Sequence, residues 1–288
     1  MISEADAEER SISVMKKTSL KHRESLTGVL FCLPSIIGIM TFFIIPFAII
    51  VRISFSESMG NPSFVGLKNY ITIIKSSAFR LAAVNTLKFN LIAVPLIIFI
   101  SFVIAMLLFR KLWGSEIFRT FFVFPLVLPA VSVTLFFRTV FPSEMMESSQ
   151  SFVILLILYI WKNCGYNIIL FLAALNSVPK MYYEAAELDG AGKFTQITRI
   201  TFPLIVPHTF FITIISIVNS FKSFREAFIL FGSHPDRSIY MIQHFMNNNF
   251  ETLNYIRLSV GAILIFLVIF VLVLVMLILR KRRGDYEL

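Results

Sequence analysis

The sequence predicts an all-α integral membrane protein, and three observations support this fold class. Hydrophobic residues make up 57% of the 288 residues, whereas soluble domains use roughly 45–50% apolar residues. The mean hydropathy is +0.81. Charged residues make up only 15% of the chain, and many of them cluster near the two ends and between long apolar runs. Little of the chain is left for a sizeable soluble domain, so we expect any water-soluble partner to be a separate chain.

Six apolar runs are long enough to cross a bilayer, whose hydrocarbon core requires about 20 mostly apolar residues in a helix. They lie at residues 27–53, 82–109, 118–140, 152–175, 204–231 and 258–279. The runs contain prolines at Pro34, Pro46, Pro95, Pro125 and Pro129. Transmembrane helices tolerate proline because neighbouring helices resatisfy the freed backbone groups. We therefore expect six transmembrane helices within a membrane domain of residues 27–279.

The connections between these runs differ in their content of lysine and arginine, which gather on the cytoplasmic side of membrane proteins. With the N-terminus inside, the cytoplasmic segments hold fifteen such residues and the external segments five. The fifteen are Arg10, Lys16, Lys17, Lys21, Arg23, Arg110, Lys111, Arg119, Lys180, Lys193, Arg199, Arg280, Lys281, Arg282 and Arg283, and the five are Lys68, Lys75, Arg80, Arg237 and Arg257. We expect residues 1–26 and 280–288 to be cytoplasmic tails of a multi-pass protein of the cell (inner or plasma) membrane.

The net charge of +9 does not indicate nucleic-acid binding. The basic residues bracket apolar segments and do not interleave with aromatic residues on a soluble face. Membrane topology and contact with lipid explain this charge better.

Residues 179–203, between the fourth and fifth runs, are unusually polar for this chain. A helical pattern follows Pro179, and Gly190 and Gly192 permit a sharp reversal of the backbone. A second helical segment, residues 194–201, then leads to Pro203 and the fifth run. The pattern predicts two short helices on the cytoplasmic surface, although the residues alone are equally compatible with an ordinary solvated loop.

The spacing within this stretch resembles the EAA motif of importer-type ABC transporter permeases. Its matching positions are Glu184, Ala185, Ala186, Gly190, Ile200, Phe202 and Pro203, with Phe202 where the motif usually has leucine. The segments LTGVLFCLPSIIGIMTFFIIPFAIIVRISFSE, VGLKNY, NTLKFN, FRTFFVFPLVLPAVSV and WKNCGYNIILFLAALNSVP also resemble this family. Nearly the whole chain is thus similar to the carbohydrate-uptake permeases of the maltose type and the glycerol-phosphate type.

The resemblance implies a function and a set of partners. Such permeases pair with a second, homologous permease subunit, dock on two ATPase subunits and receive a carbohydrate from an extracytoplasmic solute-binding protein. Their EAA segment is a coupling helix that sits in a cleft of the ATPase. The residues suit that role: Glu184 offers a directional ion pair to an arginine, while Ala185 and Ala186 permit close approach. Asp189 belongs to the same segment, Gly190 supplies the turn, and Pro203 marks the return to the membrane.

The chain itself lacks the signature of an ATPase. No G-x-x-x-x-G-K-[ST] sequence occurs, since Gly192 and Lys193 are followed by Phe194 and have no upstream glycine at the required spacing. We therefore expect this subunit not to be an enzyme and to bind no cofactor of its own. ATP and Mg would be used by the partner ATPase.

A substrate path is suggested by polar residues within two spans. Tyr159, Asn163 and Tyr166 lie at positions i, i+4 and i+7 of the fourth run, and hence on one helical face. The fifth run carries Asn219, Ser220 and Ser223. In the maltose-type permeases that this chain resembles, these six positions contact sugar, although the residue types differ. Satisfied contacts between helices are the alternative explanation.

Basic residues near this path leave the charge of the substrate open. Lys162, Lys222 and Arg225 would favour an anionic substrate if they lined a cavity. We favour the simpler alternative, in which Arg225 pairs with the neighbouring Glu226 or lies at an interface.

Other functional classes find little support. His22, His208, His234 and His244 lack the spacing of metal ligands, so we expect no metal site, and no nucleophile and base arrangement is recognisable. Cys32 and Cys164 lie in apolar runs as packing residues. The main alternative is an ion-coupled secondary transporter of a small polar solute, which would need buried carboxylates or broken-helix repeats. The spans contain almost no acidic residue apart from Glu226.

Overall fold

The computed structural model describes residues 28–60, 63–109 and 115–284, and within these ranges it is helical and contains no β-sheet. Residues 28–39 are helical and continue without interruption into the next elements. The helices that follow are η1 (Met40–Ile44), α2 (Ile45–Ser54), α3 (Lys68–Lys75), α4 (Ser77–Phe109), α5 (Ser115–Val127), α6 (Ala130–Val140), α7 (Ser143–Met146), α8 (Ser151–Asn176), α9 (Lys180–Leu188), α10 (Lys193–Gln196), η2 (Ile197–Thr201), α11 (Phe202–Lys222), α12 (Phe224–Phe231), α13 (Ile242–Glu251) and α14 (Tyr255–Gly284). The all-α fold class is confirmed.

Five stretches of helix in the described chain are long and apolar enough to cross a membrane. They are Gly28–Ser54, Ser77–Phe109, Ser151–Asn176, Lys193–Phe231 and Tyr255–Ile278. The predicted third span is different, because residues 117–140 form two helices that meet at an angle of 101°. Pro129 explains the break, since it precedes α6 with an extended backbone (ψ 142°), which ends the helix before it. Counting this bent pair, α5 and α6, as one span brings the number in the described chain to six.

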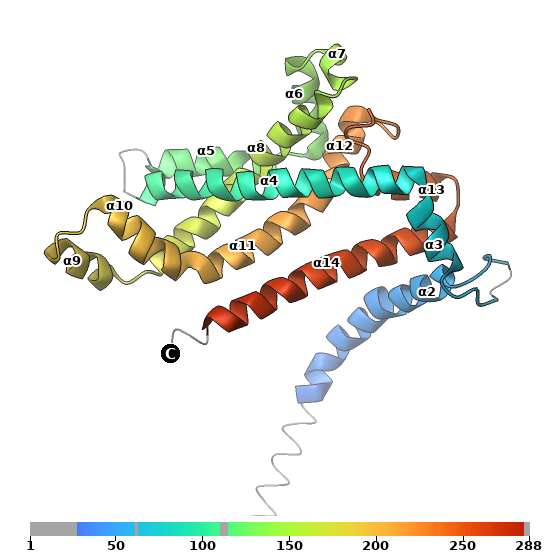
Figure 1. Ribbon diagram of the computed structural model, residues 1–288, viewed down its shortest axis with the longest axis horizontal. Coiled ribbons are helices and arrows are strands. Elements are labelled where there is room, and N and C mark those ends of the chain that lie inside the picture. Colours follow the sequence, from blue (N-terminus) through green and yellow to red (C-terminus); the bar gives the residue numbers. More distant parts are fainter. Residues whose placement is uncertain (1–27, 61–62, 110–114, 285–288) are drawn as a thin grey trace, which may run out of the picture.

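The long helices lie roughly side by side, with short helices at both ends of the bundle (Figure 1). One end carries α9 and α10 together with the C-terminal end of α14, and the other carries α3, α12 and α13 (Figure 1). Residues 1–26, the predicted N-terminal tail, lie outside the described residues. At the C-terminal end of the chain, helix α14 extends to Gly284, beyond residue 279, where the sequence predicts that the sixth span ends.

Helix α8 forms the centre of the fold and packs against α4, α5 and α11. Half of its most apolar stretch is buried, against none for residues 28–54. Gly165 allows a close contact with α5, because a Cβ atom there would lie 1.9 Å from the carbonyl oxygen of Phe122. Large apolar side chains on the helix of residues 28–54 and on α14 remain exposed, as expected for surfaces that face lipid or another subunit.

Two prolines follow single turns of π-helix. Pro46 and Pro203 each stand near the start of an α-helix, directly after η1 and η2. In each turn the residue before the proline donates its N–H to the carbonyl five residues back, from Ile45 to Met40 and from Phe202 to Ile197. Proline has no N–H and its ring collides with the preceding turn, so a local π-type adjustment keeps the helix continuous. Pro203 consequently lies near the start of α11 within the continuous helical stretch Lys193–Phe231.

Candidate functional site

The polar segment between the fourth and fifth spans forms a bracket of two helices joined by a glycine turn. Helix α9 ends at Leu188 with Asp189 as its C-cap, and Gly190 follows with a φ of 74°, a conformation that L residues other than glycine rarely adopt. The N–H of Gly190 bonds to the carbonyl of Glu187 at 3.1 Å, and the N–H of Ala191 bonds to that of Ala186 at 2.8 Å. This is the Schellman pattern of a helix end. The structure thus places the reversal at the glycine that the sequence singles out.

Polar contacts hold the two arms of the bracket together. The carboxylate of Glu187 on α9 accepts a hydrogen bond from Lys193 Nζ at 2.6 Å and one from Gln196 Nε2 at 3.5 Å, both on α10. These contacts with Lys193 and Gln196 hold the pKa of the Glu187 carboxyl below its usual value. The hydroxyls of Tyr183 and Thr201 lie 2.9 Å apart and tie α9 to the start of the fifth span. The bracket is therefore anchored within its own chain.

Glu184 differs from Glu187 in having no such internal contact. Its side chain is exposed, and within the described ranges it takes part in no hydrogen bond or ion pair. Ala185 and Asp189 are also exposed, whereas Ala186 is half-buried. The structure therefore presents a carboxylate and small side chains on an outward surface of α9, where a partner subunit has access to them.

A cavity of about 390 Å³ lies behind this bracket. Its apolar lining comes from Met106, Phe109, Leu175 and Ile197, and its polar lining comes from Tyr183, Glu187, Lys193, Gln196 and Thr201. The cavity separates much of the bracket from the ends of α4 and α8. The bracket is connected to the membrane helices by residues 177–179 after α8, by the contact of Tyr183 with Thr201, and by the continuous helix through Pro203.

The six predicted substrate-path residues lie along α8 and the α11–α12 segment, but they differ in exposure. Tyr159 is fully buried, and its hydroxyl donates a hydrogen bond of 2.8 Å to the Ser216 carbonyl on α11. Ser220 is 4% exposed and contacts Asn90 Oδ1 at 2.5 Å. Ser223 is 6% exposed and donates to the Asn219 carbonyl at 3.3 Å. In this conformation these three side chains serve as contacts within and between helices.

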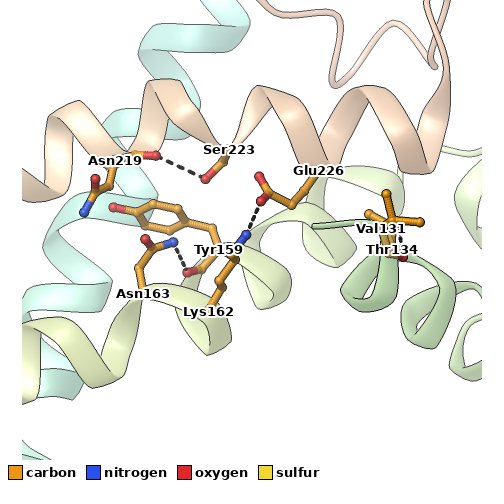
Figure 2. Close-up of polar contacts among 8 residues, drawn as sticks. All are labelled: Val131, Thr134, Tyr159, Lys162, Asn163, Asn219, Ser223 and Glu226. Atoms are coloured by element: carbon orange, nitrogen blue, oxygen red, sulfur yellow. Dashed lines mark hydrogen bonds and ion pairs between the residues drawn. The ribbon is translucent and has the colours of Figure 1, made fainter. Parts of the chain in front are cut away.

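The other three predicted residues remain accessible. Asn163, Tyr166 and Asn219 are half-buried. The Asn163 amide donates to the Tyr159 carbonyl one turn earlier, at 2.9 Å. Figure 2 shows Asn163 on α8 and Asn219 on α11 on either side of the Tyr159 ring. The substrate path therefore stays a prediction, for which these three residues are the accessible members.

A buried ion pair lies next to this set. Lys162 Nζ on α8 contacts Glu226 Oε1 on α12, and the two side chains are 17% and 6% exposed (Figure 2). Of the two alternatives for Arg225, pairing with Glu226 is wrong, because Glu226 contacts Lys162 on α8 whereas Arg225 is exposed; a position at an interface stays a prediction. Residues 225 and 226 are adjacent on a helix, so their side chains point about 100° apart. Glu226 is therefore directed toward Lys162, and Arg225 is directed elsewhere. The charge of Lys162 is balanced across two helices.

Sequence reasoning missed two further polar contacts in this interface. Asn167 is 1% exposed, and its amide nitrogen donates to Ser216 Oγ at 2.8 Å. Asn90 on α4 meets Ser220 on α11. Asn167 was detectable, since it follows Asn163 by one helical turn on nearly the same face. Asn90 was not, because its partner is 130 residues away in the sequence.

Histidine chemistry does not point to a metal site. Among the described residues, no three His, Cys, Asp or Glu side chains are grouped so that they could hold a metal ion. His22 lies outside the described ranges. His244 on α13 is fully buried and accepts a hydrogen bond from the Met241 N–H at 3.2 Å. Burial, with a smaller contribution from His234, lowers the pKa of His244 from 6.5 to about 4, so this imidazole is neutral at physiological pH.

Residues 97–284, well over half of the 288-residue chain, match the family described as the inner membrane component of binding-protein-dependent transport systems. This chain belongs to that family. It is the transmembrane permease component of an ABC importer, in which the ATPase is a separate subunit. The predicted resemblance is therefore confirmed, and the alternative of an ion-coupled secondary transporter is not supported.

Curated relatives are similar over most of this chain. The arabinooligosaccharides transport system permease protein AraP of Bacillus subtilis is 29% identical and covers 90% of this chain and 88% of its own length. The probable starch degradation products transport system permease protein AmyD of Thermoanaerobacterium thermosulfurigenes is 26% identical, covering 88% and 94%. The trehalose/maltose transport system permease protein MalF of Thermococcus litoralis is also 26% identical, covering 93% and 98%.

A solved structure shares the fold. A chain of a bacterial ABC transporter involved in the import of the acidic polysaccharide alginate superposes with a TM-score of 0.76 at 22% identity. The match covers 93% of this chain and 99% of that chain. The arrangement of helices described above is therefore an ABC permease fold.

Proposed function

We propose that this permease forms half of the membrane path of an ATP-driven importer for a sugar or oligosaccharide. The observation that carries this proposal is the set of near full-length relatives named for arabinooligosaccharides, starch degradation products, trehalose and maltose. The polar faces of α8 and α11 support it, because amides and hydroxyls are the groups that hydrogen-bond sugar hydroxyls. The carbohydrate would arrive from an extracytoplasmic solute-binding protein.

The bracket α9–α10 would couple this path to ATP hydrolysis. In this assembly a second, homologous permease completes the path, and two ATPase subunits use ATP and Mg. Glu184 would form the ion pair with the ATPase, while Ala185, Ala186 and Asp189 would make the contact surface. Gly190 and the helix that runs through Pro203 would carry a rigid-body movement from that surface into the fifth span.

The proposed orientation places the bracket and both termini in the cytoplasm. Fifteen basic residues on that side against five on the other support this orientation. In agreement with it, α9 and the C-terminal end of α14 lie at the same end of the bundle (Figure 1).

The test is to purify the tagged chain with its natural partners and compare the wild type with Glu184→Ala. We expect the wild type to bring an ATPase and a second permease with it, and the variant to lose ATP-driven sugar uptake while it remains in the membrane. Glu187→Gln is the matched control, because this glutamate lies one turn away but has its partners within the bracket. Normal uptake by Glu184→Ala would refute the coupling role, and purification without any ATPase would refute the assembly.

A further inference from the structure

The ion pair of Lys162 and Glu226 borders the predicted substrate path on two helices. Lys162 directly precedes Asn163 on α8, and Glu226 lies about one turn beyond Ser223. Figure 2 shows the pair beside Asn163, Asn219 and Ser223, with the Lys162 and Glu226 side chains directed toward each other. A substrate that binds to the Asn163 and Asn219 amides would therefore also lie within the electrostatic field of Lys162 and Glu226.

Glu226 is unusual among the acidic side chains of this protein. It is the one Asp or Glu side chain that is buried within residues 28–60, 63–109 and 117–278, the ranges in which burial is described. The other basic residues of this region do not offset it. Lys222 and Arg225 are exposed, while Arg138 donates hydrogen bonds of 2.9 and 3.1 Å to the carbonyls of Ile229 and Leu230 at the end of α12. The pairing of Lys162 with Glu226 thus sets the charge at this buried point beside the path.

The energetics of buried charges give this pairing a consequence for selectivity. An unpaired lysine in a medium of low dielectric attracts an anion strongly. A lysine in contact with a carboxylate offers no net charge, and the carboxylate also repels an approaching anion. A neutral sugar makes hydrogen bonds to amides without requiring a charged partner.

We propose that Glu226 is a specificity-determining residue, which neutralises Lys162 and so restricts this path to uncharged carbohydrates. The inference rests on the proposed function and deepens it by naming the class of substrate. Uronic acids and sugar phosphates would be disfavoured because the Lys162 charge that could balance them is already paired with Glu226.

The probes for this proposal differ in charge while sharing one sugar backbone. They are trigalacturonate and its fully methyl-esterified, uncharged form, with maltotriose and arabinotriose as neutral references. Equilibrium binding is measured on the purified transporter with its partner permease and ATPases, in the absence of the solute-binding protein. Omitting that protein ensures that its own selectivity does not determine the result.

We expect the wild type to bind neutral glycans and to discriminate against the acid relative to its ester. In Glu226→Gln, the ratio of acid to ester binding should rise by about tenfold or more, because one unpaired charge a few ångströms from an anion supplies at least that factor. The double variant Lys162→Gln/Glu226→Gln removes both charges and should show no such rise. Arg225→Gln is the matched control for a neighbouring exposed cation, and its ratio should equal that of the wild type.

Three results would count against these proposals, and they are distinguishable. Wild-type protein that binds the acid as tightly as the ester would overturn the specificity proposal and leave the carbohydrate function intact. An unchanged ratio in Glu226→Gln would overturn the role of that residue. If none of the four glycans bound to an assembled transporter, the carbohydrate function would fail, and the specificity proposal with it. Should Glu226→Gln not assemble, the acid-to-ester comparison in the wild type decides the specificity proposal.

Discussion

Two lysine–glutamate pairs in this protein have the same chemistry and opposite surroundings. Lys193 and Glu187 join the two arms of the bracket, with side chains 69% and 56% exposed. Lys162 and Glu226 join α8 to α12 within the membrane helices, with side chains 17% and 6% exposed. Water and salt screen the first pair, whereas loss of either partner of the second leaves a buried charge uncompensated. The exposed pair therefore contributes little to the stability of the protein, whereas the buried pair is needed for it.

The largest expected effect comes from breaking the buried pair from one side. Lys162→Met should destabilise the protein by about 3–5 kcal/mol, because Glu226 would remain buried without its counter-charge. The double variant Lys162→Met/Glu226→Leu should recover most of this loss, since it leaves no charge behind. The measurement is the thermal midpoint of the purified transporter in detergent. A single variant as stable as the wild type would show that the interior tolerates the unpaired carboxylate.

His244 is a further titratable side chain for this comparison, because it is fully buried and has no oppositely charged partner among the described residues. A histidine with a lowered pKa stabilises the fold fully above its unfolded pKa near 6.5, and that contribution is lost as the pH falls from about 6.5 through about 4. The total loss is about 3 kcal/mol. The protection factors of the α13 amides, which are the intrinsic exchange rates at each pH divided by the observed rates, should therefore fall between pH 7.5 and pH 5.

The corresponding control separates burial from histidine content. His244→Leu should remove this pH dependence, whereas replacement of the exposed neighbour in His234→Gln should preserve it. An equal fall of the protection factors in His244→Leu and in the wild type would assign the effect to another group.

The smallest effect is expected at the exposed pair. Lys193→Gln should leave the thermal midpoint unchanged within error, because both side chains are mostly solvated. Any residual difference from the wild type should disappear at about 1 M salt, where the Debye length falls to about 3 Å. A loss of stability comparable to that of Lys162→Met would contradict the distinction between the two pairs.

The sequence predicted the local features of the bracket well. Gly190 has the positive φ that a helix reversal requires, and the polar residues around it indicated a surface segment. Pro203 stands at the start of α11, where the sequence places the return to the apolar span, but the residues did not reveal how the helix passes through it. Here a turn of π-helix over Ile197–Thr201 keeps the helix continuous, and the adjustment depends on neighbouring backbone geometry that no residue pattern reveals.

The sequence by itself determined the fold class, the family and most of the spans, because hydrophobic length and the spacing of residues 184–203 are properties of the chain alone. The tertiary structure decided which polar groups meet. Glu226 contacts Lys162, which is 64 residues away, and not the adjacent Arg225. It also decided that Tyr159 is buried against α11. Helical periodicity assigns a side chain to a face, but the partner on the opposite face depends on how α8, α11 and α12 pack.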